Sequence, residues 1–191
     1  MKKITLLVAC IAMACSAAFA EGNISYGAKV GFNLTNELGG GAKGLHDMKA
    51  GYQAGLFAEF QVAPSIAIAP EVVFSDQGYS YKVGDKRYYD YNNYINVPIM
   101  GKFYVAKDFS IDFGPQIGFM VYNKVNTVVG KVDIKDACNK VDFGLGLGAS
   151  YNLSENAFIQ ARYNLGLTHI AKNSDSFNGN GEIQVSLGYR F

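Results

Sequence analysis

The charged side chains that interrupt apolar stretches are the first candidates for chemistry in this sequence. Each stands at a position of opposite parity to its apolar neighbours, so these acids and bases would share one side of an extended chain. The set is Lys29, Glu59, Glu71, Lys102, Asp112, Asp142, Arg162, Glu182 and Arg190. Because unpaired charges in a dry interior carry a heavy desolvation cost, we expect these residues to pair with one another. The alternative is a narrow, water-filled ion path lined by the same side chains.

The two histidines offer little for catalysis. His46 lies in a Gly-rich stretch, and His169 follows an apolar segment. His169 with Ser174 or Ser176 is a conceivable base and nucleophile, but loop histidines are more often solvated, so we predict no catalytic residue. Neither histidine has a second His or a Cys at metal-ligand spacing, so no metal and no cofactor are predicted.

Tyrosines gather in a polar stretch between residues 78 and 94. They are Tyr79, Tyr81, Tyr88, Tyr89, Tyr91 and Tyr94. This composition favours contact with sugars or protein partners, because a tyrosine ring presents both an apolar face and a hydroxyl group. The alternative is an aromatic girdle at a membrane interface.

Eight stretches that alternate apolar and polar residues with a period of two must position these side chains. They are residues 26–34, 52–62, 66–75, 95–105, 109–121, 141–153, 159–167 and 182–191. After the amino terminus, no apolar run reaches the ~20 residues that a helical membrane span needs. The pattern predicts an all-β fold, an eight-stranded antiparallel up-and-down transmembrane β-barrel.

The character of the two faces decides between a membrane barrel and a soluble one. A soluble calycin-like barrel would place its apolar side chains inside, around an apolar ligand. Here the polar face holds a few long charged groups and many glycines, among them Gly144, Gly146 and Gly148. Such a set cannot make a dense hydrophobic core. The continuous apolar face is therefore expected to contact lipid.

The amino terminus predicts export. Lys2 and Lys3 precede an apolar run that ends in Ala18-Phe19-Ala20, a small-x-small cleavage signal. We expect a cleaved signal peptide over residues 1–20 and one barrel domain over residues 21–191. A lipoprotein that begins at Cys15 is the alternative, although the Leu usually found three residues earlier is missing.

Cleavage at this site would also change the charge and the cysteine count. The 17 basic residues would fall to 15 against 16 acidic ones, and a near-neutral chain without a basic stripe argues against a nucleic-acid partner. Cys138 would be the remaining cysteine, and we expect it to be a free thiol.

Connection lengths predict the orientation. Those near Pro64, Lys107 and Glu155 span two to four residues, and those near Gly40, Asp85, Asp133 and Asp175 run to about a dozen or more. Outer-membrane barrels keep short turns in the periplasm and long loops outside, so both termini are expected in the periplasm.

Three prolines fall inside these stretches, Pro70, Pro98 and Pro115. Proline cannot donate to a strand ladder, and a closed barrel has no free edge on which to place it. A bulge near Pro98 is therefore expected.

Several motifs along the chain have a familiar form. They are GAKVGFNL (27–34), GLFAEF (55–60), APE with FSDQG (69–71 and 74–78), YINVPI (94–99), FGPQIG (113–118) and ARYNLGLT (161–168). With them, the mature chain resembles the PorT-like outer-membrane β-barrel proteins of Gram-negative bacteria in the Bacteroidetes group. Asn96 departs from the pattern, because many such proteins have Glu there. The resemblance implies a barrel in the outer membrane, and some members are linked to protein secretion.

The LGYRF ending (187–191) looks like the terminal signal read by the barrel assembly machinery, with Tyr189 and Phe191 as its aromatic residues. The machinery is therefore an expected partner of the carboxyl-terminal strand.

Three functions remain open. We predict a structural or interaction barrel whose partners are outer-membrane lipid and a protein or glycan met by the long extracellular loops. It would be a monomer with a side-chain-filled lumen. The first alternative is a narrow porin-like channel for ions or small solutes. The second is an outer-membrane lipid-modifying enzyme.

Overall fold

The computed structural model describes residues 24–39, 46–83, 86–127, 130–132, 139–169 and 178–191. Every regular element in these residues is a β-strand. The strands are β1 (Ile24–Gly39), β2 (His46–Ala63), β3 (Ile66–Gln77), β4 (Tyr79–Val83), β5 (Lys86–Ala106), β6 (Phe109–Thr127), β7 (Gly130–Val132), β8 (Val141–Asn152), β9 (Ala157–Gly166) and β10 (Asn178–Arg190). No helix in the described residues is long and apolar enough to cross a membrane.

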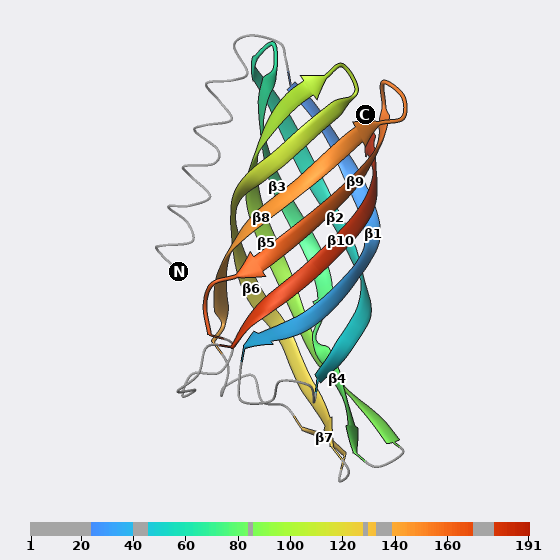
Figure 1. Ribbon diagram of the computed structural model, residues 1–191, viewed down its shortest axis with the longest axis vertical. Coiled ribbons are helices and arrows are strands. Elements are labelled where there is room, and N and C mark those ends of the chain that lie inside the picture. The colour runs from blue at the N-terminus through green and yellow to red at the C-terminus, as the bar shows by residue number, and fades with distance from the viewer. Residues whose placement is uncertain (1–23, 40–45, 84–85, 128–129, 133–138, 170–177) are drawn as a thin grey trace.

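The strands close into a barrel (Figure 1). β1 pairs with both β2 and β10, and the circle continues through β3, β5, β6, β8 and β9, with each neighbouring pair antiparallel. The short strand β4 continues the line of β3, because it pairs with the same two neighbours, β2 and β5. In the described residues the wall therefore has eight antiparallel strands, and the predicted fold class is confirmed.

Exposure alternates along the wall strands. On β9, Ile159 and Tyr163 are exposed while Gln160, Arg162 and Asn164 between and beside them are buried. The same alternation on the other strands puts large apolar side chains outside, among them Phe32, Leu56, Phe103, Phe113, Leu147 and Leu187. The predicted assignment of faces is confirmed: polar side chains fill the interior, and the apolar exterior is suited to lipid.

The polar stretch from residue 78 to 90 is a hairpin, where the sequence predicts a loop. Gly78 adopts a φ of 135°, which only glycine tolerates easily, and separates β3 from β4. β4 then pairs with the first residues of β5, from Ser80 opposite Tyr89 to Val83 opposite Lys86. Tyrosine and valine favour strands, and the same propensity extends β6 to Thr127. Strands thus occupy much of what was expected to be loop.

The predicted bulge near Pro98 is wrong. Pro98 pairs with Gln116 on β6, and Gly101 pairs with Phe113 in the same register. The register shifts of this strand pair lie instead between Asn93 and Tyr94 and near Ala106. β5 accommodates the missing N–H group of Pro98 without an extra residue. Its ladder with β3 omits a few pairs beside Pro98 and resumes in the same register.

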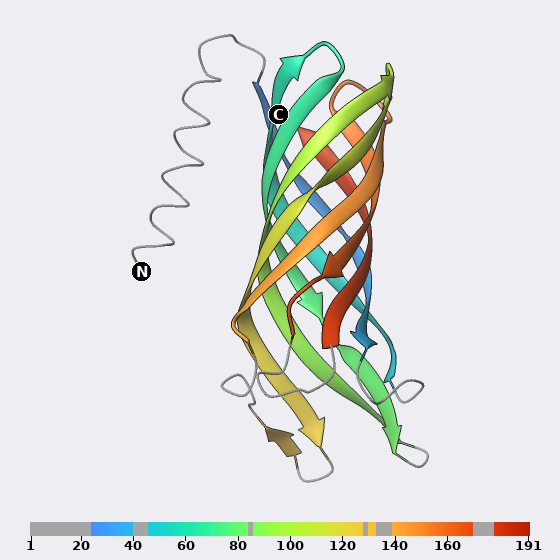
Figure 2. The same cartoon turned by 60° about the vertical axis from the view of Figure 1, so that its left-hand side comes forward.

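The two ends of the barrel differ. The short turns after β2, β5 and β8 lie at one end, together with the start of β1 and the carboxyl terminus (Figure 1). At the other end, the β4–β5 hairpin and the β6–β7 hairpin project beyond the body of the barrel (Figure 2). We call these the short-turn end and the loop end.

Candidate functional site

A buried ion triad crosses the middle of the lumen. Lys29 on β1 lies 2.6 Å from Glu71 Oε2 on β3. Arg162 on β9 donates from Nη1 and Nη2 to the two oxygens of the same carboxylate, each at 2.8 Å. The three side chains are only 1%, 5% and 1% exposed, respectively. A bidentate pair in so dry a setting fixes both partners, so the triad ties β1, β3 and β9 together across the interior.

Asp112 forms a second centre beside the triad. Ser110 Oγ, Ser150 Oγ and Gln160 Nε2 donate to its carboxylate at 2.8, 2.5 and 2.9 Å. The amide oxygen of Gln160 accepts a hydrogen bond from Lys29 at 3.0 Å. Gln160 therefore links the two centres into one network.

A third cluster lies toward the short-turn end. Glu59 Oε2 is 2.9 Å from Lys102 Nζ and 3.7 Å from Arg190 Nη2, and Tyr104 donates its hydroxyl to the other oxygen of Glu59. Arg190 also donates to Asn152 Oδ1 at 3.0 Å. Here two cations face one carboxylate.

Two aromatic rings fill the lumen between the triad and this third cluster. Phe57 and Phe158 meet edge to face, with ring centroids 5.4 Å apart and an interplanar angle of 80°. Lys102 Nζ lies 5.4 Å and Arg190 Cζ 4.8 Å from the centroid of Phe158, distances at which a cation is attracted to a ring. The rings and the cations thus form one packed layer.

The sequence prediction did not include these two rings. Phe57 stands directly opposite Gly27 on β1, and Phe158 stands opposite Gly188 on β10. Each ring covers a glycine of the neighbouring strand, where a Cβ atom would collide with it. The sequence signal that could have identified them is the alternation along each strand, since both phenylalanines occupy positions of the polar face.

Toward the loop end, Glu182 is held by neutral donors. They are Asn33 Nδ2 at 2.8 Å, Ser75 Oγ at 2.6 Å, Asn164 Nδ2 at 3.1 Å and Gln77 Nε2 at 3.2 Å. Asp142, half-buried on β8, accepts a hydrogen bond from Thr168.

The expectation that the lumen charges pair with one another therefore holds for only part of the set. Glu59 and Glu71 have cationic partners, whereas Asp112, Asp142 and Glu182 form no ion pair among the described residues. The physical reason is that serine, asparagine and glutamine also occupy the polar face. Their hydroxyl and amide groups solvate a buried carboxylate without adding a second charge.

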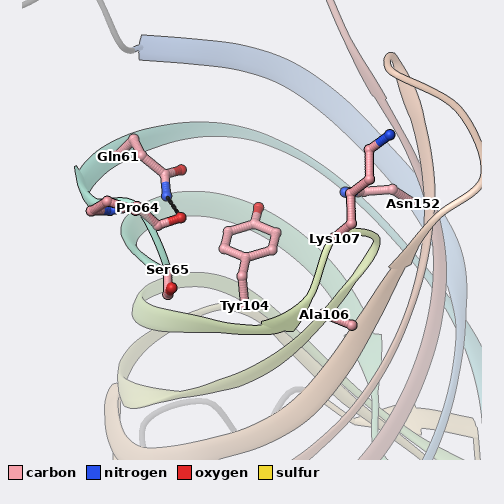
Figure 3. Close-up of a pocket in the computed structure, with 7 residues that line it drawn as sticks. All are labelled: Gln61, Pro64, Ser65, Tyr104, Ala106, Lys107 and Asn152. Atoms are coloured by element: carbon pink, nitrogen blue, oxygen red, sulfur yellow. Dashed lines mark hydrogen bonds between the residues drawn. The ribbon is translucent and has the colours of Figure 1, made fainter.

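A pocket of about 520 Å³ opens at the short-turn end (Figure 3). Its lining residues are Gln61, Pro64, Ser65, Tyr104, Ala106, Lys107 and Asn152. Gln61 donates to the carbonyl oxygen of Pro64 at 3.4 Å across its rim. Since Tyr104 and Asn152 bind Glu59 and Arg190, the inner wall of the pocket is part of the third cluster.

The tyrosines do not form one surface. Tyr94 is 2% exposed and lies inside the barrel, so it is removed from the predicted contact surface. Tyr91 is half-buried with its ring 4.6 Å from Lys49 Nζ, and Tyr79 is half-buried on β4. The backbones of Tyr81, Tyr88 and Tyr89 lie in the β4–β5 hairpin, and their side chains are outside the described part of the chain.

The aromatic residues at the carboxyl terminus lie on the exterior. Tyr189 is 54% and Phe191 68% exposed, and their ring centroids are 6.1 Å apart. Phe191 N donates to the carbonyl oxygen of Tyr26 at 2.9 Å, which joins the end of the chain to β1.

The remaining candidates for chemistry are scattered. His169 is exposed, and its carbonyl oxygen accepts a hydrogen bond from Asn139. Ser174, Ser176 and Cys138 lie outside the described residues. In the part of the chain that the structure describes, no group of three or more His, Cys, Asp or Glu residues is placed to hold a metal ion.

Comparisons with known proteins agree with this architecture. The model of the family described as outer membrane protein beta-barrel domain matches residues 6–191. The comparison with curated proteins finds no match.

One similar solved structure is that of the attachment invasion locus protein Ail of Yersinia pestis, in complex with the heparin analogue sucrose octasulfate. It is 17% identical to this chain, with a TM-score of 0.55, and the match covers 88% of this chain and 99% of that one. Neisserial surface protein A is 13% identical with a TM-score of 0.55, over 89% of this chain and 98% of that one. At these identities the likeness shows the fold alone.

Proposed function

The chain belongs to the family of outer membrane protein β-barrel domains, and from this we propose that it is a structural and interaction protein whose lumen is filled by its own side chains. It is a small integral barrel of the outer membrane. The observation that carries the proposal is the ion triad, in which Lys29, Glu71 and Arg162 are 1%, 5% and 1% exposed. An ion would have to separate a buried bidentate pair to pass, at a large electrostatic cost.

We further propose that the short-turn end faces the periplasm and that the loop end meets partners outside the cell. The difference between the two ends supports this, because outer-membrane barrels keep short turns on the periplasmic side. Residues 1–20 would serve as the signal peptide. The chain would be a monomer without enzymatic activity, in the PorT-like group.

Two contacts complete the proposal. The exposed apolar exterior would contact outer-membrane lipid. The barrel assembly machinery would read the last strand through Tyr189 and Phe191, and their exposure supports this role.

A narrow channel is the second candidate. Several buried polar atoms in the loop half of the lumen, such as Asn33 Oδ1, Gln53 Oε1 and Asn164 Oδ1, have no hydrogen-bond partner among the described residues. Buried polar atoms of this kind usually bind ordered water. A hydrated loop half would leave the triad and the aromatic layer as the barrier to be crossed.

Planar-bilayer recording of the refolded chain tests the proposal. We expect no discrete conductance from the wild type or from Lys107→Ala at the short-turn end, with folding shown by heat-modifiable mobility on gels. Discrete wild-type steps that change in Arg162→Ala would establish the channel instead. A lipid-modifying activity of the wild type that is lost in a folded His169→Ala variant would indicate an enzyme in place of either function.

A further inference from the structure

The two hairpins at the loop end rise well beyond the lipid-facing part of the barrel. Among the β5 side chains that the structure describes, Ile95, 38% exposed, is the exposed large apolar one nearest the loop end, and the strand continues for nine residues to Lys86. At about 3.3 Å per residue this is ~30 Å along the strand, or ~20 Å along the membrane normal for a strand tilted by about 45°. A headgroup layer is only about 5 to 8 Å thick on each side. The beginning of β5 at Lys86 therefore stands outside the lipid phosphates.

The hairpins carry mostly basic residues. These are Lys82, Lys86 and Arg87 in the β4–β5 hairpin and Lys124 and Lys131 in the β6–β7 hairpin. The acidic residues of residues 79–90 and 122–132 are Asp85, which is outside the described residues, and Asp90, which is 2% exposed. The two hairpins extend from neighbouring strands, because β5 and β6 pair with each other toward the loop end as far as Asp90 opposite Val125.

The register brings like charges together. Lys82 stands directly opposite Arg87, and Lys86 is the next residue along β5. Directly opposed like charges destabilise a strand pair. Lys82 is exposed and presents its positive charge to the surroundings. An anionic partner would offset the cost of the opposed charges.

Aromatic residues lie next to these charges. Tyr81 stands opposite Tyr88, one position from the Lys82–Arg87 pair, and Ser80 stands opposite Tyr89, two positions from it. Tyrosine combines a flat apolar surface with a hydroxyl group, which suits a sugar ring, and arginine binds planar anionic groups through two hydrogen bonds. The backbone places both kinds of residue at one tip.

We propose that the two hairpins form a binding surface for an anionic polysaccharide outside the membrane. The inference rests on the proposed function, because it takes the loop end to be extracellular. The height of the β4–β5 hairpin argues for a polymer over lipid headgroups, and its tyrosines argue for sugar rings.

Binding of the full barrel, in nanodiscs of neutral lipid, to immobilised dextran sulfate tests the inference. We expect binding that weakens as salt is raised from low to physiological concentration, and no binding to uncharged dextran. The triple variant Lys82→Gln, Lys86→Gln, Arg87→Gln should weaken binding at least tenfold. Lys107→Gln, at the opposite end, should leave it unchanged, while Lys82→Gln alone should weaken it measurably.

Three results would overturn the inference: no binding to dextran sulfate, binding that the triple variant retains, or equally strong binding to polyglutamate. The last would indicate an acidic protein partner. The bilayer recording separates this from the proposed function. If the barrel neither conducts nor binds dextran sulfate, only the polysaccharide inference fails. If the barrel conducts, the proposed closed lumen is wrong, whatever the hairpins bind.

Discussion

Among single side chains, Glu71 has a central electrostatic role, because one carboxylate holds both Lys29 and Arg162. In Glu71→Gln the shape is retained, but two buried cations lose their counter-charge. Breaking a buried pair in this way typically costs about 3 to 5 kcal/mol. We expect the free energy of unfolding, measured by urea denaturation in lipid vesicles, to fall by about that amount.

Glu155→Gln is the matched control, because Glu155 is exposed in a turn. Its free energy of unfolding should stay within about 0.5 kcal/mol of the wild type. Equal stability of Glu71→Gln and Glu155→Gln would show that the triad contributes nothing to the fold.

Phe158 is the second side chain with a specific role, because it contacts Phe57 and two cations and covers Gly188. Phe158→Ala removes all of these contacts, and truncation of a buried phenylalanine costs about 3 to 5 kcal/mol. Urea denaturation should show this loss. Ile159→Ala, one residue along and 42% exposed on the outside, should show a smaller one, and the reverse order would contradict the lumen packing described above.

The residues that face the lumen could be predicted from sequence, but their partners could not. Parity alone places Lys29, Glu71 and Arg162 on the polar face of their strands. Their contacts depend on the stagger between strands, since Glu71 is 42 residues from Lys29 and 91 from Arg162. The same limit explains why neutral donors around Glu182 were not foreseen.

At the level of the elements, the break at Gly78 sets how the β4–β5 hairpin leaves the barrel. Its φ of 135° is unfavourable for any residue with a side chain, and a Cβ atom there would overlap the carbonyl oxygen of Asp90. We expect Gly78→Ala to loosen β4 and to raise hydrogen exchange of its amides, at a cost of about 1 to 3 kcal/mol.

Gly101→Ala is the comparison, because a Cβ atom there has no neighbour nearer than 3.4 Å. Exchange of the β4 amides should be unchanged in Gly101→Ala. If Gly78→Ala also leaves that exchange unchanged, the β3–β4 break does not control the hairpin.

The strands themselves could largely be predicted, and the errors have local causes. Alternation located eight wall strands, because each has one face toward lipid and one toward the lumen. It failed between residues 78 and 90, where both faces are polar or tyrosine-rich and no apolar face marks a strand. At Pro98 the sequence predicted an irregularity that the strand does not have, because a missing hydrogen-bond donor can be tolerated without a bulge.

On the scale of the whole molecule, the closed wall and the apolar exterior follow from composition and period, but the direction of the barrel in the membrane rests on the contrast between its ends. The orientation can be tested by labelling single-cysteine variants with a membrane-impermeant maleimide in a Cys138→Ser background. Lys82→Cys, exposed in the β4–β5 hairpin, and Lys107→Cys, exposed in a short turn, report the two ends. Both positions lie in water in either orientation, so reactivity depends on which side of the outer membrane they occupy. On intact cells we expect label on Lys82→Cys alone, and on Lys107→Cys only after the outer membrane is permeabilised. The opposite pattern would place the basic hairpins in the periplasm and exclude an extracellular polysaccharide as their ligand.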